Sequence, residues 1–526
     1  MSIRPAIPLL VFTLVQSMPA QPGSIDPTFG NAGIVTTDAS AGSDVARDGL
    51  LLPDGRIVVC GAGNSQGTFL LLRYHQNGTV DSSFGTNGVV MTAMGGTGVE
   101  ATAIVRQTDG RLLAAGHVVN GGTSFSVVVR YDSTGALDFS FGASGKAIRD
   151  IGTGGEVKDV VLQPDGKILV AGTFRSGSTL FMGLHRYKAN GTPDSTFGFN
   201  GTVTRGPGVE NHCSAIALQH DGRIVAAGTT DQGAGSRILL FRFNSNGTPD
   251  STFGTVGRTI TTVSAFPNFG MDVALRDSHV VVAGYAGIAA NLTHRFAVVR
   301  YTSRGLPDST FGTAGIALTP EIGLTTGFAF LNKMLILQSG KILLTGQGTN
   351  LPTSDDFVVA RMKSTGAMDS TFGADGIVYT NITGNGRDVS YQLLHQPDGN
   401  IIALGQGGVG ALAGGAQVSL VRYLNDELPT AVVNPALAPA AFSLDQNFPN
   451  PFNPTTRIRY TLRRGGFVTL TLFDMIGRRV SVLADGMEQA GAHEVTLDAR
   501  NLAAGAYIYR LQSNGSAVSR MLMFVK

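Results

Sequence analysis

The sequence has few of the residues from which enzymes commonly build metal or nucleophile sites. It contains only 2 cysteines and 9 histidines in 526 residues. The histidines are scattered, with no His-x-x-x-His or His-Glu-x-x-His pair, and two cysteines cannot supply a Cys-x-x-Cys metal site. Gly-x-Ser-x-Gly does not occur in a strand-turn-helix setting. The sequence therefore predicts no catalytic, metal-binding or cofactor-binding residues.

Charge is also scarce. Charged residues make up 14% of the chain, against roughly 25% in an average globular domain. The formal net charge is +2, and no cluster of lysines and arginines with interleaved aromatics is present. These features exclude a nucleic-acid partner from the prediction.

Long apolar runs are missing beyond the N-terminus. A single basic residue, Arg4, precedes a short apolar stretch from Ala6 to Val15. Ala20 follows as a small residue at the expected cleavage site. This pattern is typical of a secretory signal peptide, and the stretch is shorter than the roughly 20 apolar residues that span a bilayer. We expect residues 1–20 to be a signal peptide and the chain to have no transmembrane helix.

The two cysteines are not expected to pair. Cys60 and Cys213 fall at different positions of non-adjacent repeats, which disulfide geometry disfavours. Both are predicted to be small buried apolar residues.

What the sequence has in abundance is a repeated phrase, Asp-x-x-Phe-Gly-x-x-Gly. Successive Phe-Gly steps are separated by 55, 57, 56, 56, 58 and 61 residues. Such a period indicates a tandem array of one supersecondary unit. The seven phenylalanines are Phe29, Phe84, Phe141, Phe197, Phe253, Phe311 and Phe372.

A second phrase, an arginine usually followed by an aromatic residue, is out of phase with the first at both ends. The first Phe-Gly phrase, at Asp26, has no such arginine before it, and the last arginine, Arg422, has no Phe-Gly after it. A closed ring needs this offset if the N-terminal piece completes the sheet that the C-terminal piece begins, because closure removes open strand edges. The seven arginines are Arg73, Arg130, Arg186, Arg242, Arg300, Arg361 and Arg422.

Each repeat is predicted to contain four strands. In the third they are Lys146–Asp150, Val157–Gln163, Lys167–Gly172 and Leu180–Tyr187, separated by glycine-rich and Pro-Asp-Gly turns. The strands are apolar on both faces, as stacked blades require. We therefore predict an all-β fold, with a seven-bladed β-propeller of repeats of about 56 residues over 24–425.

A fixed offset links the two phrases. In six repeats an arginine precedes an aspartate by eight residues, as Arg186 precedes Asp194. Across a hairpin this spacing predicts a cross-strand ion pair, worth on the order of 0.2–1 kcal/mol. The functional alternative is a ring of arginines that face a central channel and bind anions.

The amino-acid composition changes after the last repeat. Residues 426–441 are rich in proline and alanine, which is linker composition. From Phe442 to Lys526, short strand-like runs alternate with glycine turns, a pattern typical of a small antiparallel sandwich. We predict an immunoglobulin-like β-sandwich over 442–526.

This C-terminal region resembles a known family. Phe448 to Thr456, reading Phe-Pro-Asn-Pro-Phe-Asn-Pro-Thr-Thr, is followed in order by Phe473 to Arg478, Ala490 to His493 and Leu502 to Tyr507. These motifs resemble the type A C-terminal sorting domain of the type IX secretion system. The resemblance implies that residues 442–526 are read by that machinery after passage through the periplasm, so that the protein is secreted or held at the outer-membrane surface.

The repeats resemble the delta-60 repeat family, whose Leu-Gln-Pro-Asp-Gly-Lys-Ile-Leu-Val-Ala-Gly core stands at Leu162 to Gly172. That resemblance implies a propeller-like fold and an exported protein. It supplies no functional residues.

Two functions stay open. The first is a noncatalytic binding or adhesion module for an extracellular protein or glycan, acting through the variable connections near Gly63–Gly67, Thr230–Ser236, Ala286–His294, Gly348–Ser354 and Gly405–Ala416. The second is an exported hydrolase or lyase on a polymer, with an acid/base pair in a central cleft. The lack of a visible cluster of repeat-breaking acids favours binding over catalysis. His185, at an otherwise apolar position, is interpreted as a core residue.

Overall fold

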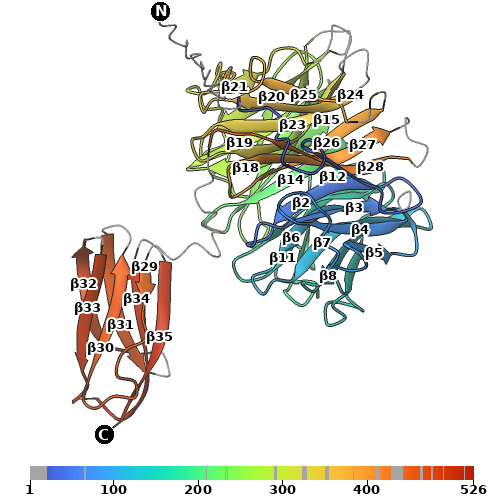
Figure 1. Cartoon of the computed structure of the whole chain (residues 1–526). Coiled ribbons are helices and arrows are strands. Elements are labelled where there is room, and N and C mark those ends of the chain that lie inside the picture. The colour runs from blue at the N-terminus through green and yellow to red at the C-terminus, as the bar shows by residue number, and fades with distance from the viewer. Residues whose placement is uncertain are drawn as a thin grey trace, which may run out of the picture. The chain divides into compact units, whose positions relative to one another are not determined.

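The computed structural model divides into two compact units, residues 1–429 and 430–526 (Figure 1). The structure describes residues 21–63, 67–208, 210–231, 233, 235–288, 293–322, 328–349, 355–382, 384, 386–409, 415–427, 442–462, 466–474, 478–489, 491–500, 502–513 and 516–525. The predicted signal peptide lies outside the described residues, as does most of the predicted linker.

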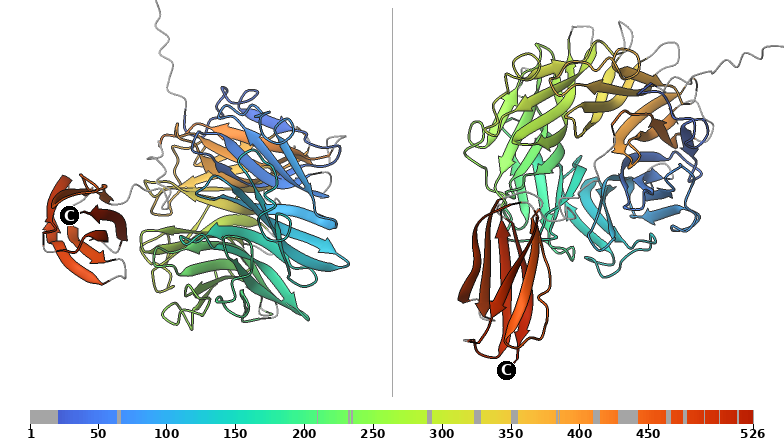
Figure 2. Two further views of the ribbon diagram at one scale, coloured as in Figure 1. Left: turned by 90° about the horizontal axis from the view of Figure 1, so that it is seen from below. Right: turned by 60° about the vertical axis from the view of Figure 1, so that its left-hand side comes forward.

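The described part of the first unit consists of seven four-stranded antiparallel sheets. They follow one another around a ring, which Figure 2 shows as a passage from blue through green to orange. In spatial order they are β2 (Val45–Leu51), β3 (Ile57–Gly63), β4 (Thr68–Tyr74) and β5 (Val89–Ala93); β6 (Thr97–Arg106), β7 (Leu112–Asn120), β8 (Thr123–Tyr131) and β9 (Lys146–Asp150); β10 (Glu156–Leu162), β11 (Ile168–Ser176), β12 (Thr179–Tyr187) and β13 (Thr202–Arg205); β14 (Glu210–Leu218), β15 (Ile224–Asp231), β16 (Ser236–Phe243) and β17 (Arg258–Thr261); β18 (Asn268–Arg276), β19 (His279–Gly287), β20 (His294–Tyr301) and β21 (Ile316–Leu318); β22 (Ala329–Ile336), β23 (Ile342–Thr349), β24 (Asp355–Met362) and β25 (Ile377–Thr380); β26 (Arg387–His395), β27 (Ile401–Val409), β28 (Gln417–Tyr423) and β1 (Ile34–Thr37).

The last sheet is completed by the N-terminal strand, as the offset between the two phrases predicted. β1 pairs antiparallel with β28, with Ile34 opposite Val421. The Asp26 amide donates to the Arg422 carbonyl over 2.9 Å, and the Gly373 amide donates to the Pro22 carbonyl over 2.8 Å. The ring is therefore closed by hydrogen bonds between the two ends of the repeat array.

Burial follows from stacking the sheets around the ring. Every residue of β3 is buried, and all seven phrase phenylalanines are 0% exposed. Hydrophobic clusters join neighbouring sheets, such as the one that holds Phe84 between residues of β3 and β7. Lys146–Asp150 forms β9, the fourth strand of the sheet that begins with β6. The prediction that grouped it with the three strands that follow it in the chain is therefore wrong, because those strands begin the next sheet.

The Phe-Gly glycine has a steric role at each join. Its φ lies between 52° and 55° in all seven repeats, a region that glycine adopts without strain. A Cβ at Gly142 would lie 2.2 Å from the Lys146 carbonyl oxygen. The Gly142 amide donates to the Asn190 carbonyl of the next repeat over 2.8 Å, so the phrase fixes both a turn and an inter-sheet contact.

The second unit contains two antiparallel sheets. One is β29 (Phe442–Leu444), β30 (Thr455–Leu462) and β33 (Gly491–Asp498); the other is β32 (Arg479–Glu488), β31 (Gly466–Asp474), β34 (Gly505–Ser513) and β35 (Ser516–Phe524). Side chains of both sheets, including Ile458, Leu472 and Tyr509, form one buried cluster. The immunoglobulin-like topology stays a prediction.

Candidate functional site

The first strand of each propeller sheet carries a β-bulge at the same place. The partner register skips one residue between Ala46 and Asp48 on β2, and likewise on the other six first strands. A bulge leaves one residue unpaired and redirects its side chain. The unpaired residues are Arg47, Thr102, Lys158, Ser214, Met271, Asn332 and Tyr391.

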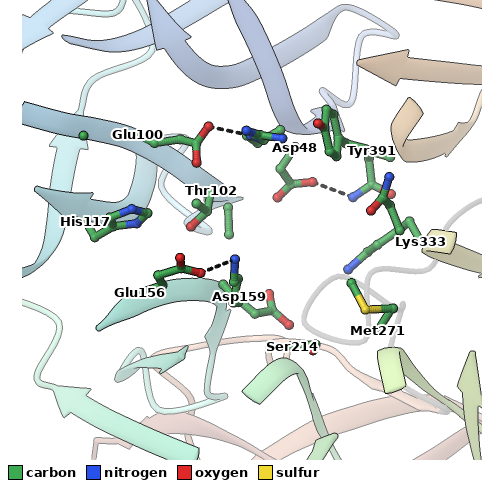
Figure 3. A pocket seen from close by; sticks show the side chains of 16 residues that line it. Asp48, Glu100, Thr102, His117, Glu156, Asp159, Ser214, Met271, Lys333 and Tyr391 are labelled. Carbon is green, nitrogen blue, oxygen red and sulfur yellow. Dashed lines mark hydrogen bonds and ion pairs between the residues drawn. The ribbon is translucent and has the colours of Figure 1, made fainter. Parts of the chain in front are cut away.

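All seven of these residues line one cavity of about 420 Å³, which we call the axial cavity (Figure 3). Its wall takes residues from every first strand and also from β7. The remaining lining residues are Asp48, Gly98, Glu100, Ala103, His117, Glu156, Asp159, Lys333 and Gln392. The volume lies within the roughly 300–1,000 Å³ typical of small-ligand sites.

The bulged position differs in chemistry from one repeat to the next. It holds two cations, three neutral polar groups, a thioether and a phenol, whereas the arginine and Phe-Gly phrases recur around the ring. A scaffold that needed only to close would gain nothing from this variety. The axial cavity is therefore the strongest candidate for a functional site.

One wall of the cavity is built from ion pairs. Arg47 lies 2.5 Å from a Glu100 carboxylate oxygen and stacks over the Tyr391 ring at 4.2 Å. Lys158 lies 2.5 Å from a Glu156 oxygen. Although burial opposes the effect, Lys158 holds the pKa of Glu156 below its usual range, and burial lowers the pKa of His117. Glu156 is therefore an anion at neutral pH, and His117 is neutral.

Three aspartates tie neighbouring first strands together. Asp48 accepts the Ile104 amide over 2.8 Å, and Asp159 accepts the Ile216 amide over 2.8 Å. Asp272 accepts the Met334 amide over 2.9 Å. Each carboxylate thus joins its own first strand to that of the next sheet.

Lys333 reaches from β22 toward the centre of the cavity (Figure 3) and lies 3.0 Å from Asp272. Burial alone would lower its pKa, but Asp272, Asp159 and Asp48 raise it, so the ammonium is charged. Burial in turn raises the pKa of Asp159 to about 6 and also raises the pKa of Asp48. The cavity therefore contains carboxylates whose pKa values are shifted in opposite directions, down for Glu156 and up for Asp159 and Asp48.

The repeated arginines form ion pairs with the aspartates, as predicted, and do not line the cavity. In all seven pairs, including the closing pair of Arg422 and Asp26, the nearest N–O distance is 2.7 to 2.9 Å. Each guanidinium also lies 4.5 to 4.9 Å from the centroid of a phrase phenylalanine. The Arg73 guanidinium further donates to the Ser133 carbonyl of the next sheet over 2.7 Å. The alternative prediction, a ring of arginines that binds anions in a central channel, is wrong, because these side chains form ion pairs and join neighbouring sheets.

His185 and the two cysteines have structural roles. His185 is 2% exposed, contacts the Ser126 hydroxyl through Nδ1 at 3.0 Å, and packs against Phe174. Burial lowers its pKa to about 3, so it is neutral. Cys60 and Cys213 are free and buried. Neither the histidine nor the cysteines lines the axial cavity.

The variable connections named from the sequence lie partly outside the described residues, so their role stays a prediction. The cavity itself could not be predicted from the sequence, because its residues come from seven separate repeats and each first strand supplies only one to four of them. Within the described part of the chain, no group of three or more His, Cys, Asp or Glu side chains could hold a metal ion. A comparison of the repeats at the residue after Ala46, Ala101 and Val157 would have exposed the variation.

Two family models match the chain. The first, described as a domain of unknown function (DUF5122) beta-propeller, matches residues 52–84, 107–141, 163–197, 219–253 and 337–372. The second, described as a secretion system C-terminal sorting domain, matches residues 446–525. This chain carries DUF5122 β-propeller repeats and a secretion-system sorting domain. The sorting domain marks the propeller protein for handling by type IX secretion machinery, and so for the cell surface or the medium.

Solved structures similar to this propeller protein are distant. A fungal alcohol oxidase of the AA5 family is 13% identical, with 96% of this chain and 100% of that chain covered and a TM-score of 0.41. The β-propeller domain of the Trilobed protease from Pyrococcus furiosus is 9% identical, with 75% and 95% covered and a TM-score of 0.35. The polysaccharide lyase Uly1 is 8% identical, with 75% and 89% covered and a TM-score of 0.30. At these values the similarities carry no argument about function.

A comparison with curated proteins found no match. Across the ranges that the structure describes, no helix is long and apolar enough to cross a membrane.

Proposed function

We propose that the exported ring is a noncatalytic binding module and that the axial cavity is its ligand site. The observation that supports this is the convergence of seven chemically different bulge residues on one cavity of about 420 Å³. A cavity of this size suits a small polar group, such as a saccharide unit at the end of an extracellular glycan, better than a protein surface. The type IX sorting domain delivers such a module to the place where glycans are met.

The contacts of the acids favour binding over catalysis. Glu100 and Glu156 each have a cationic partner, and both Asp159 oxygens accept backbone N–H groups, from Val160 and Ile216. A general acid needs a proton within reach of the substrate. Carboxylates that are held by the fold in this way supply polar contacts more readily than proton transfer.

The second candidate is an exported hydrolase or lyase that acts on a polysaccharide or another polymer. One observation favours it: Asp48, Glu100, Glu156 and Asp159 converge on one cavity, with the pKa of Glu156 lowered and that of Asp159 raised to about 6. Carboxyl groups whose pKa values are pushed apart are typical of acid/base pairs. Turnover therefore has to be tested together with binding.

A glycan array and a hydrolase panel on the same purified full chain test the proposal. Ser214 is a small, partly exposed residue of the cavity wall, so Ser214→Phe should fill the cavity without entering the core. We expect the wild type to bind one class of glycan without turnover and Ser214→Phe to lose at least about tenfold in affinity. Phe139→Ser, at a residue 73% exposed on the outer surface, is the control. Turnover of any glycan would establish the second candidate, and binding unaffected by Ser214→Phe would exclude the cavity.

A further inference from the structure

The charged groups of the axial cavity do not balance. Arg47, Lys158 and Lys333 each contact one carboxylate, of Glu100, Glu156 and Asp272 respectively. This leaves two further aspartates of the cavity wall, Asp48 and Asp159.

These two aspartates accept hydrogen bonds from neutral donors and share the single charge of Lys333 with Asp272. Asp48 accepts from the Gly49 and Ile104 amides and from the Gln392 side chain. Asp159 accepts from the Val160 and Ile216 amides. Hydrogen bonds from amides hold a carboxylate in place but do not cancel its charge. With every group ionised, the four carboxylates and three cations that line the cavity leave one negative charge, and Asp272 beside Lys333 adds a second. This balance favours a cationic ligand and repels an anionic one.

Aromatic side chains gather at the other side of the ring. Phe269 on β18 and Phe330 on β22 each stand two residues before the unpaired residue of the bulge, the position that Glu100 and Glu156 occupy on β6 and β10. The repeat register therefore places these rings at the same height around the axis as the two glutamates. Phe269 stacks on Tyr285 at 4.7 Å, and Phe330 stacks on Phe328 at 6.0 Å between ring centroids.

This aromatic cluster, completed by His294 at 5.6 Å from Phe330, is partly open. Phe328 is 41% exposed, although large apolar side chains are normally covered. Flat aromatic faces beside polar groups suit a ring that has an apolar C–H face and hydroxyl edges. A simple amine would use the carboxylates alone and leave the rings unexplained.

We infer that the ligand of the axial cavity is a saccharide unit that bears a free amino group, an inference that rests on the proposed function. Its ammonium lies between Asp48 and Asp159, where three N–H donors meet carboxylate oxygens. Its ring lies toward Phe269 and Phe330. Acidic saccharides are excluded by the net negative charge.

Isothermal titration calorimetry with the full chain near neutral pH tests the inference. The probes are a glucosamine tetramer, its N-acetylated counterpart and a galacturonate tetramer, which share size and differ in charge. We expect the glucosamine tetramer to bind at least about tenfold more tightly than the N-acetylated one, a difference of about 1.4 kcal/mol, and the galacturonate tetramer not to bind.

Two variants separate the contributions. Asp159→Asn keeps one acceptor oxygen for the Ile216 amide, loses the oxygen that accepts from the Val160 amide and removes the charge, so it should reduce the preference for the amine to about threefold or less. Phe330→Ala should weaken both bound sugars by the same factor. Thermal unfolding of both variants checks that the ring is intact.

Each outcome has a distinct meaning. Equal binding of the amine and its N-acetylated form would overturn the inference and leave the proposed function standing. Tighter binding of galacturonate would also overturn it. Absence of binding by all three saccharides, with the glycan array also blank, would overturn both.

Discussion

At the residue scale, the chain combines repeated positions with a few that break the repeat. Most of the repeated positions could be predicted from the sequence, because an arginine and an aspartate eight residues apart must meet across a short hairpin. Their contacts with the next sheet could not, because Ser133 and its counterparts lie about one repeat away along the chain. Single residues also show where the repeat tolerates strain.

Val256 is such a strained position. It has a φ of 54° and is 72% exposed, while the equivalent residue of the preceding repeat is Asn200 with a φ of 49°. A β-branched residue in this region is disfavoured by roughly 1–2 kcal/mol, and asparagine is tolerated. Val256→Asn should therefore raise the free energy of unfolding by about 1 kcal/mol.

The reverse change supplies the control for Val256. Asn200→Val should lower the free energy of unfolding by a similar amount in denaturant titrations. The same sign of change in both variants would contradict the strain assigned to the backbone.

Asp159 gives a prediction about pH. Its folded pKa of about 6 is above the ordinary value of 3.8, and Lys333, Asp272 and Asp48 are the charged groups nearby. The folded state therefore binds the proton more tightly, and stability falls as pH rises from about 4 through 6. Asp159→Asn should gain melting temperature relative to the wild type over this range, by an amount that corresponds to at most about 3 kcal/mol. A flat difference between Asp159→Asn and wild type from about pH 4 to 7 would show that Asp159 is not held in a charge-poor site.

Asp194 should behave in the opposite way. Its pKa is lowered by hydrogen bonds from Thr196 and by Arg186, although burial opposes this. The stability that this pair contributes is present above about pH 4 and is lost as pH falls further.

At the element scale, the strands were largely predictable and the bulges were not. Predicted strands such as Lys146–Asp150 and Leu180–Tyr187 agree with β9 and β12 to within one residue, since apolar runs between glycine turns leave few alternatives. A bulge adds one residue without changing the apolar texture of a strand. The strands that carry the seven bulge residues could therefore be predicted, but the bulges that turn these residues toward the axial cavity could not.

The ion pairs that join elements should differ sharply in strength. Arg186 and Asp194 are both buried, whereas Lys167 and Asp165 in the same sheet form an exposed pair. Removal of one partner of a buried pair costs about 3–5 kcal/mol, while an exposed pair contributes about 0–1 kcal/mol. Arg186→Ala should therefore lower stability several times more than Lys167→Ala in matched denaturant titrations. Equal losses would mean that the arginines are solvated and do not join sheets.

At the scale of the whole molecule, closure depends on the N-terminal strand. Its pairing could be predicted because the two sequence phrases are offset at the ends of the array. The axial cavity could not, because residues as far apart as Arg47 and Tyr391 meet only when the ring is closed. The number and the phase of the repeats can be read from the sequence. The residues that line the axial cavity cannot, because they meet only when the ring is closed.

Removal of β1 should open the ring. A chain that begins after Thr37 leaves the outer edge of β28 unpaired and removes Asp26 from Arg422. Exposed edges promote association, so this variant should unfold at lower temperature and form larger species in size-exclusion chromatography. A chain that ends at residue 429 keeps the whole first unit and should unfold like the ring of the full chain. Unchanged behaviour of the first variant would contradict closure by β1.

The most direct test of the axial site uses the fact that the chain contains no tryptophan. Tyr391→Trp places a single indole on the cavity wall and keeps an aromatic face for Arg47, while Phe139→Trp places one on the outer surface. We predict that a saccharide found to bind the full chain changes the emission of the Tyr391→Trp variant in a saturable way and leaves that of the Phe139→Trp variant constant. A saturable change from the outer indole alone would place the ligand elsewhere and contradict the account.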